Sequence, residues 1–325
     1  MCVKKNLITG GAGFIGSHLA EALLRRHEKV VIIDNLSTGS MDNIKHLKTD
    51  QKFSFHIDTI MNEKLMAKLI KDCDVVYHMA AAVGVKYIID NPLESIRTNV
   101  KGTEVVLEFA NSMGKKKVFL ASTSEIYGKD RAGKRIFKEE DDRVLGPTTI
   151  SRWSYSCSKA MDEFLALAYW REKKLPVVIA RFFNTCGPRQ TGRYGMVMPR
   201  FVKQALLNQP ITIYGDGKQT RSFTYVGDAV RAVIALAHAP KAVGQIFNIG
   251  NPKAVSIKEL AEKIKAWTRS RSRVVHIPYE KAYAEGFEDM RHRRPDIGKI
   301  TRYVGFRPEV ELDAMIDSII KYLEK

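Results

Sequence analysis

The chain has 325 residues, of which 45% are hydrophobic and 27% charged, so it can bury one large core or two moderate ones. Its apolar runs are strand-like pieces such as VVIIDN, far shorter than the roughly 20 residues of a membrane span, and no apolar secretory segment follows the N-terminus, so we expect a cytoplasmic protein. The net charge of +17 is spread along amphipathic helices without a nucleic-acid motif, which favours small anions over nucleic acid as partners.

Apolar strand-like runs alternate with helical patterns up to about residue 182. The runs are VKKNLIT, KVVIID, FSFHID, DVVYHMA, KKVFLAST and PVVIARFF. Such alternation predicts an α/β domain with a doubly wound parallel sheet. Beyond NTCGPRQ the elements shorten between Gly and Pro signals, with strands such as ITIYGDG, QIFNIGNP and RVVHIPY and amphipathic helices near 199–208, 256–268 and 311–324. We therefore expect domains at 1–182 and 183–325, the second mainly a smaller C-terminal α/β substrate lobe.

The stretch ITGGAGFIGSHLAEALL follows the first strand and opens a helix. Its glycines have the spacings Gly11-x-Gly13-x-x-Gly16 and Gly10-x-x-Gly13-x-x-Gly16, which permit a tight turn and close backbone approach. The N-terminus of the following helix offers N–H groups to a pyrophosphate. With an acidic residue, Asp34, ending the next strand, the pattern predicts a Rossmann-type dinucleotide site; a purely structural glycine turn is the alternative.

Asp34 predicts the kind of dinucleotide. Its carboxylate can accept hydrogen bonds from the adenosine ribose and would repel a 2′-phosphate, so we expect NAD and not NADP. The segment Asn35 to Thr38 adds polar groups and no basic residue that would hold such a phosphate. Asp58, which ends FSFHID, is a candidate for the adenine amino group, with an ordinary strand-end carboxylate as the alternative.

Tyr155 and Lys159 are four residues apart in SRWSYSCSKAMDEF, so a helix places them on one face. An ammonium near a phenol favours the phenolate, and such a tyrosine can take the proton of a sugar hydroxyl while the carbon is oxidised. Thr123, at the end of the fifth strand, can share the hydrogen bond to that hydroxyl. Alone the pair is a common feature of solvated helices; after a glycine fingerprint and a Ser/Thr-bearing strand end it predicts a catalytic site.

With these motifs the chain resembles the extended short-chain dehydrogenase/reductase family, in its nucleotide-sugar epimerase/dehydratase branch. The matching stretches are TGGAGFIGSHL, HMAA, TNVKGT, STSEIYG, RFFNTCGPRQ, IYGDGKQTRSFTYVGD, FNIG and RRPDIGK. The resemblance covers nearly the whole chain. It implies oxidation of a sugar at its 4-position by tightly held NAD, driven by Thr123, Tyr155 and Lys159, and a homodimer built through long helices around 92–112 and 151–172.

The resemblance also implies two sets of binding residues. The cofactor-binding set is Gly10, Gly13, Phe14, Ile15, Gly16, Asp34, Asn35, Ser37, Thr38, Asp58, Thr59, Ala80, Ala81, Asn99, Tyr155 and Lys159. The substrate-binding set is Ser124, Asn184, Val197, Lys203, Tyr214, Gln219, Arg221 and Arg293. Arginine suits such a site because its guanidinium pairs with two phosphate oxygens at once. For each of the cationic residues an ordinary surface charge is the alternative.

Glu125 in TSE is the residue that separates activities within the branch. A 4-epimerase needs no further acid or base after the 4-keto sugar forms, whereas a 4,6-dehydratase or a decarboxylase benefits from an extra carboxyl group. The triplet resembles GDP-mannose-type dehydratases and UDP-glucuronate decarboxylases, and an arginine at Arg221 suits a sugar acid. We expect a UDP-glucuronate decarboxylase with Glu125 as a catalytic residue; UDP-hexose 4-epimerase and 4,6-dehydratase are the alternatives.

Other interpretations remain open from the sequence. Glu125 could cap a turn or pair with Lys129 or Arg131. The protein could be an NAD-sensing binding protein of the same fold, or a simple oxidoreductase with exchangeable NAD. The four cysteines, Cys2, Cys73, Cys157 and Cys186, lack paired spacing, so neither a metal site nor a disulfide framework is expected.

Overall fold

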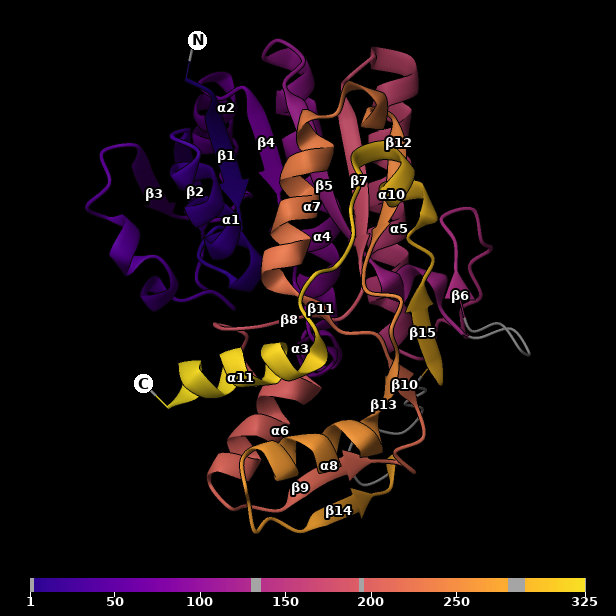
Figure 1. Ribbon diagram of the computed structural model, residues 1–325. Helices are drawn as coiled ribbons and strands as arrows, with labels where there is room; N and C mark the ends of the chain where they lie inside the picture. The colour runs from indigo at the N-terminus through magenta and orange to yellow at the C-terminus, as the bar shows by residue number, and fades with distance from the viewer. Residues whose placement is uncertain (1–2, 130–135, 193–195, 280–289, 325) are drawn as a thin grey trace.

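The computed structural model describes residues 3–129, 136–192, 196–279 and 290–324. Within these residues seven parallel strands form the main sheet in the order β12-β7-β5-β4-β1-β2-β3 (Figure 1). The strands are β1 (Lys5–Thr9), β2 (Lys29–Asp34), β3 (Phe53–Ile57), β4 (Val75–His78), β5 (Lys117–Thr123), β7 (Val177–Phe182) and β12 (Gln245–Ile249). The predicted doubly wound parallel sheet is confirmed.

Helices cover both faces of this sheet, and β5 shows why. Phe119 packs into the core on one face, while its neighbours Val118 and Leu120 pack into the core on the other, since successive side chains of a strand point to opposite sides. The first face is covered by α1 (Phe14–Arg25), α7 (Val226–His238) and α10 (Gly298–Val304). The second is covered by α2 (Glu63–Lys71), α4 (Pro92–Ser112) and α5 (Arg152–Lys173).

Part of the second half of the chain returns to the main sheet. The stretch QIFNIG, expected in the smaller lobe, forms β12 and pairs with β7, with Phe247 opposite Ala180. Helix α7 is an element that the sequence pattern did not indicate. It packs against both α1 and β7 and buries Val226, Val230 and Val233, so it lacks the broad polar face of an amphipathic helix. The chain therefore crosses between the sheet and the lobe more than once.

The smaller lobe is built on three helices with a core of their own. These are α6 (Val197–Leu206), α8 (Ile257–Trp267) and α11 (Leu312–Leu323), all close to the predicted ranges. Phe201, Leu260 and Ile316 pack together between them. A capping box between Ser256 and Glu259 starts α8. Figure 1 shows the lobe below the arrowheads of the main strands.

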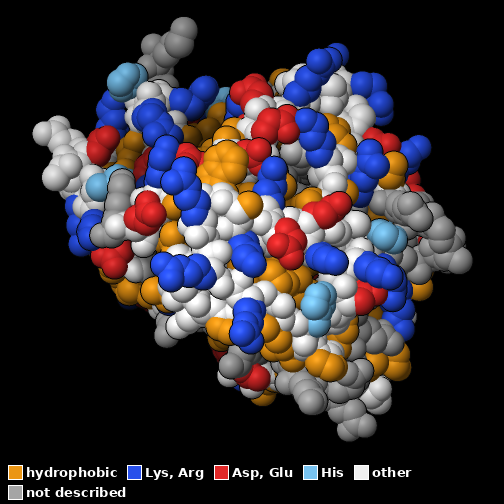
Figure 2. Space-filling view, turned by 60° about the horizontal axis from the view of Figure 1, so that its bottom comes forward, with side chains coloured by type: hydrophobic (Ala, Val, Ile, Leu, Met, Phe, Trp, Pro, Cys, Tyr) orange, Lys and Arg blue, Asp and Glu red, His pale blue; other side chains and the backbone are white. Residues whose placement is uncertain are grey.

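Short elements complete the fold. A second sheet has four short strands, in the order β13 (Val255–Ser256), β10 (Thr220–Arg221), β15 (His292–Pro295) and β6 (Ile136–Phe137). Two further pairs of strands are β11 (Thr224–Tyr225) with β8 (Thr185–Cys186), and β14 (Val274–Ile277) with β9 (Ile211–Tyr214). The remaining helices are α3 (Val85–Asp90), η1 (Met41–Asn43), η2 (Lys45–Leu47), η3 (Ser124–Tyr127) and η4 (Pro240–Ala242). On the face in Figure 2, Lys and Arg side chains lie in small groups with acidic side chains between them. No helix in the described ranges has both the length and the apolarity that crossing a membrane requires.

The packing at Gly16 predicts a cost for any side chain there. A Cβ on Gly16 would lie 2.2 Å from the carbonyl oxygen of Gly10 and 2.9 Å from Cα of Gly11, so backbone atoms would have to shift. We expect Gly16→Ala to lower the free energy of unfolding by about 1–3 kcal/mol. In Gly192→Ala, the matched control, the nearest atom is at an ordinary 3.4 Å. Thermal unfolding of both variants tests this; equal melting temperatures would contradict it.

Candidate active site

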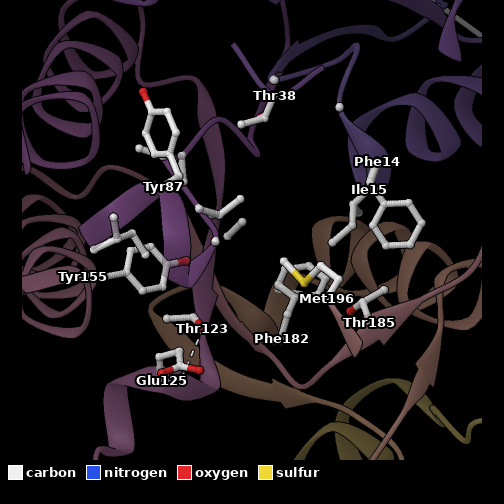
Figure 3. Close-up of a pocket in the computed structure, with 18 of the residues that line it drawn as sticks. Phe14, Ile15, Thr38, Tyr87, Thr123, Glu125, Tyr155, Phe182, Thr185 and Met196 are labelled. Carbon is white, nitrogen blue, oxygen red and sulfur yellow. Dashed lines mark hydrogen bonds between the residues drawn. The ribbon is translucent and has the colours of Figure 1, made fainter. Parts of the chain in front are cut away.

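A cavity of about 470 Å³ lies between the carboxyl ends of the main strands and the smaller lobe. Figure 3 shows Tyr155, Thr123 and Glu125 on one side of it and Phe14, Ile15 and Met196 on the other. The predicted site residues that line it are Gly10, Gly13, Phe14, Ile15, Gly16, Asp34, Asn35, Ser37, Thr38, Asp58, Thr59, Ala80, Ala81, Thr123, Ser124, Glu125, Tyr155, Lys159, Asn184, Val197, Tyr214, Gln219, Arg221 and Arg293. The fold thus gathers into one cavity residues that are far apart in the chain.

The glycine loop forms one end of the cavity. Gly10 has a φ of +69°, and a Cβ there would lie 2.8 Å from the backbone nitrogen of Ala80, so only glycine fits this turn. Gly13 is the N-cap of α1, whose first N–H groups therefore border the cavity. A cradle that excludes side chains at the start of a helix is what a dinucleotide pyrophosphate needs.

Asp34 is held against this loop. Its Oδ2 accepts a hydrogen bond from the backbone N–H of Ala12 at 2.9 Å, and its Oδ1 accepts one from Leu36 at 2.8 Å. Burial raises the pKa of the Asp34 carboxyl, and these backbone N–H groups oppose that rise. Asp58, farther along the same wall, accepts from the backbone of Thr59 at 2.7 Å and from Asn62 at 2.8 Å. Both carboxylates are thus oriented by the protein and keep acceptor capacity for a ligand.

Tyr155 and Lys159 reach the cavity from the same face of α5. Tyr155 is hydrogen-bonded to the Thr123 side chain. Burial raises the pKa of the Tyr155 hydroxyl, the charge of Glu125 adds to that rise, and the Thr123 hydrogen bond opposes it. The Nζ of Lys159 donates to Oδ2 of Asp162 at 2.7 Å. The predicted base and its lysine therefore stand together at the wall of the cavity.

Glu125 lies between two arginines at the same wall. Arg152 donates to its Oε2 at 3.1 Å, and Arg293 donates to its Oε1 and, at 3.0 Å, to Oδ1 of Asn184. Burial by itself raises the pKa of Glu125, but the guanidinium groups of Arg293 and Arg152 bring it down to about 2. Glu125 is therefore ionised at neutral pH. Of the partners considered from the sequence, Arg131 lies outside the described residues.

The charges of this wall favour an anionic ligand. One carboxylate and two guanidinium groups leave the Glu125 cluster with one net positive charge. Arg221, also on the wall, donates to the carbonyl oxygens of Thr220 at 2.9 Å and Met290 at 2.8 Å, which orient its guanidinium. Arginines fixed in this way suit carboxylate and phosphate oxygens.

The smaller lobe forms the other end of the cavity. The guanidinium of Arg200 stacks on the ring of Tyr214 at 4.1 Å from its centroid. Gln219 donates to the carbonyl oxygen of Tyr214 at 2.9 Å and to the hydroxyl of Tyr279 at 3.1 Å. Val197 enters from the first turn of α6. Planar and aromatic groups of this kind suit a nucleotide base.

Two predicted binding residues lie elsewhere. Lys203 is exposed on α6, whereas Arg200, almost one turn earlier, lines the cavity. Asn99 is buried behind the wall, where its Oδ1 accepts from the backbone of Ala82 at 2.8 Å and its Nδ2 donates to Ser158 at 3.2 Å. Asn99 therefore orients the segment after β4 and does not border the ligand space. A contact of Lys203 or Asn99 with a ligand finds no support in this geometry.

Four further residues line the cavity without having been predicted as site residues: Arg152, Gln190, Arg200 and Tyr279. A signal existed for Arg152, because it precedes Tyr155 by three residues and a helix puts both on one face. For the others the sequence carries no comparable spacing, since their elements meet the cavity only through the packing of the lobe.

Comparison with known proteins shows likeness over the full length. The family model described as GDP-mannose 4,6 dehydratase matches residues 7–319. UDP-N-acetyl-alpha-D-glucosaminuronate decarboxylase of Bacillus cytotoxicus is 44% identical over 323 residues, 99% of this chain and 98% of that protein. UDP-glucuronic acid decarboxylase 1 of Danio rerio is 33% identical over 99% of this chain and 73% of that protein. A solved structure of UDP-glucuronic acid 4-epimerase from Bacillus cereus, in complex with UDP-glucuronic acid and NAD, has a TM-score of 0.88 at 30% identity, covering 98% and 99% of the two chains.

The pKa of Glu125 predicts how stability depends on pH. A carboxylate with a pKa of about 2 in the folded chain and roughly 4.3 in the unfolded chain stabilises the fold above pH 4.3, and this is lost as pH falls toward 2. We expect Glu125→Gln to lower the free energy of unfolding by on the order of 2–3 kcal/mol at neutral pH, and the difference from wild type to shrink on acidification.

Chemical denaturation at several pH values measures this difference. Glu140→Gln is the matched control, because the Glu140 side chain is 73% exposed and its distance to Lys299 is 3.9 Å. A Glu125→Gln difference that stays constant between about pH 7 and about pH 3.5 would show that the ion cluster does not stabilise the fold.

Proposed function

This chain belongs to the extended short-chain dehydrogenase/reductase family, in the branch of nucleotide-sugar epimerases, dehydratases and decarboxylases, and we propose that it is an NAD-dependent decarboxylase of a UDP-linked uronic acid. The observation that carries the proposal is Glu125 held between Arg152 and Arg293 beside Thr123 and Tyr155. A wall with a net positive charge next to a catalytic tyrosine suits a sugar that bears its own carboxylate. The decarboxylase relatives support the same choice.

The cofactor of this proposal fits the glycine end of the cavity. The cradle at Gly10, Gly13 and Gly16 leaves no room for a Cβ at two of its positions, and Asp34 presents a carboxylate beside it. NAD bound there would supply a reversible oxidation at carbon 4 of the sugar. Tyr155 takes the proton of the 4-hydroxyl, Thr123 shares the hydrogen bond to it, and the Lys159 ammonium favours the phenolate.

The oxidised sugar then loses carbon dioxide. A ketone at carbon 4 makes the carboxylate on carbon 5 a β-keto acid, so the bond between carbons 5 and 6 breaks and its electron pair passes into the enolate of carbons 4 and 5. Carbon 5 then takes up a proton that comes ultimately from solvent, and the hydride removed from carbon 4 returns to it, so that the ketone becomes a hydroxyl group again. Arg293 and Arg152 hold the substrate carboxylate. When the two arginines turn toward the substrate carboxylate, their interaction with Glu125 weakens and the pKa of Glu125 rises. Glu125 then becomes able to carry the proton that carbon 5 takes up.

The relatives favour one sugar over another. The Bacillus cytotoxicus decarboxylase named for N-acetylglucosaminuronate is 44% identical, and the Danio rerio decarboxylase named for glucuronic acid is 33% identical. We therefore place UDP-N-acetylglucosaminuronate first and UDP-glucuronate second. A 4-epimerase of UDP-glucuronate is the second candidate function, favoured by the fold neighbour of that name. It would use the same arginines and omit the loss of carbon dioxide.

We also keep the cytoplasm as the predicted location. The cysteines in the described part of the chain, Cys73, Cys157 and Cys186, are free thiols, which suits a reducing compartment.

Product masses test the proposed function. We expect the purified protein to convert UDP-N-acetylglucosaminuronate, or UDP-glucuronate more slowly, into a product lighter by one carbon dioxide. A product of unchanged mass and altered stereochemistry would identify an epimerase, and loss of water a dehydratase; either outcome overturns the proposal. Tyr155→Phe is the matched variant and should lose at least about tenfold in turnover while keeping its fold and bound NAD.

Homodimer formation through α4 and α5 is a second prediction. These helices pack against each other and expose large apolar side chains: Leu93 at 62% and Ile96 at 41% on α4, and Met161 at 49% and Phe164 at 63% on α5. We expect light scattering to give twice the 36.8 kDa chain mass and Phe164→Asp to shift it toward the monomer. Trp267→Asp, at an exposed side chain that ends α8, is the control that should leave the mass unchanged. A monomeric wild type would refute the dimer.

A further inference from the structure

The lysine of the proposed active site has a buried counter-ion on its own helix. The side chains of Lys159 and Asp162 are 2% and 0% exposed, and their charged atoms lie 2.7 Å apart. Lys159 borders the cavity, whereas Asp162 approaches the ammonium from the interior, behind the cavity wall. An ammonium buried this deeply is costly without an opposite charge, so Asp162 bears on whether Lys159 stays charged.

Asp162 is itself the end of a chain of buried polar groups. The Thr103 side chain, on α4, lies beside its carboxylate and lowers its pKa. Nε2 of His78, at the end of β4, lies 3.1 Å from Oγ1 of Thr103, and its Nδ1 lies 2.7 Å from Oγ1 of Thr9, at the end of β1. The backbone N–H of Ala80 donates to Oγ1 of Thr9 at 3.2 Å. The chain therefore runs from the segment after β4 to Lys159.

The donor and acceptor properties of these groups give the series of hydrogen bonds a single direction. A carboxylate only accepts, so the Thr103 hydroxyl beside it can act only as a donor toward Asp162, which leaves it to accept from His78. His78 is neutral, because burial and the charge of Lys159 lower its pKa to about 3. Its proton is then on Nε2, and its Nδ1 accepts from the Thr9 hydroxyl, which accepts in turn from Ala80. Every donor points toward Asp162, so the chain polarises toward the carboxylate.

Other charged groups surround the pair. Glu163, the next residue on α5, is neutralised by Arg181 at 2.7 Å and also accepts from Ser122. Glu125, in η3 after β5, and Arg293, on β15, both act on the Tyr155 hydroxyl. Burial raises the pKa of the Asp162 carboxyl, while Lys159 and Thr103 lower it. Within the described residues, Lys159 is the cation that contacts Asp162.

We infer that Asp162 is a positioning residue that holds the Lys159 ammonium charged and in place beside Tyr155. The polar groups of Thr9, His78 and Thr103, with their donors directed toward Asp162, keep its carboxyl group ionised. The inference rests on the proposed function for the role of Lys159 in catalysis. The structural part of the inference, that the charge of Lys159 depends on Asp162, does not depend on which sugar is the substrate. Asp162 does not line the cavity, so it acts on the site through Lys159 and through its own charge, which raises the pKa of the Tyr155 hydroxyl.

Direct titration of Lys159 tests the inference without turnover. The protein as purified is labelled with lysine carrying ¹³C at the ε-carbon, and Lys159→Arg assigns the resonance. In Asp162→Asn we expect the Lys159 midpoint to fall by at least about one pH unit, because a buried ammonium without its counter-charge loses its proton more easily. Glu172→Gln, an exposed carboxylate on the same helix, is the control. A midpoint within a few tenths of the wild-type value overturns the inference.

Kinetics separate positioning from a loss of fold. Once a substrate is turned over, Asp162→Asn should move the alkaline limb of the kcat profile to lower pH by a similar amount and change KM by less than about twofold, since Asp162 is outside the cavity. If Asp162→Asn only lowers the melting temperature and leaves the alkaline limb of the kcat profile where it is in the wild type, the inference is wrong. Failure of every substrate would refute the proposed function and leave the titration result standing.

Thr103 provides a milder variant if Asp162→Asn does not fold. Thr103→Val keeps the shape of the side chain but removes the hydroxyl that donates to Asp162, so the Lys159 midpoint should move in the same direction by a smaller amount. Thr103→Ser restores the hydroxyl and should restore the midpoint. An unmoved midpoint in Thr103→Val overturns the part of the inference that concerns the chain of hydrogen bonds.

Discussion

The common direction of the main strands is the constraint on which the site depends. Because β1, β2, β4, β5 and β7 are parallel, their carboxyl ends lie at one edge of the sheet, and the residues that follow them border one cavity. The glycine loop, Asp34, Ala80, Thr123 and Asn184 each stand at such a strand end. The smaller lobe closes over this edge and adds Val197, Tyr214 and Arg221. The residues predicted to bind the dinucleotide and those predicted to bind the substrate therefore meet at the edge of the sheet.

Two buried clusters of charge act on Tyr155. Lys159 and Asp162 form a neutral pair, while Glu125, Arg152 and Arg293 keep one positive charge at the cavity wall. Without a ligand, burial and the charge of Glu125 raise the pKa of Tyr155. A substrate carboxylate that draws the arginines toward itself changes this balance. The same arginines thus link substrate recognition to the acid–base groups of the proposed reaction.

The parts of the fold that sequence patterns missed have identifiable reasons. Helix α7 packs against both α1 and the sheet, so its residues carry no clear polar face. Strand β12 joins the sheet from a segment that begins 63 residues after β7 ends. Lys203 and Arg200 share one helix of the lobe, and only the orientation of α6 decides which of them reaches the cavity. Asn99 was expected at the cofactor and instead orients Ala82 from behind the wall. Each difference concerns packing between elements and not the type of element.

Sequence patterns predicted the parallel sheet, the glycine cradle, the acid at the end of β2, and the helical spacing of Tyr155 and Lys159. These are local features, because they depend on strand and helix periodicity, on glycine conformation and on residues at most a few positions apart. Which charged groups contact one another depends on the packing of distant elements. Glu125 and Arg293 are 168 residues apart, and Thr9, His78, Thr103 and Asp162 come from four different elements. Such contacts depend on how elements pack, which no local pattern encodes.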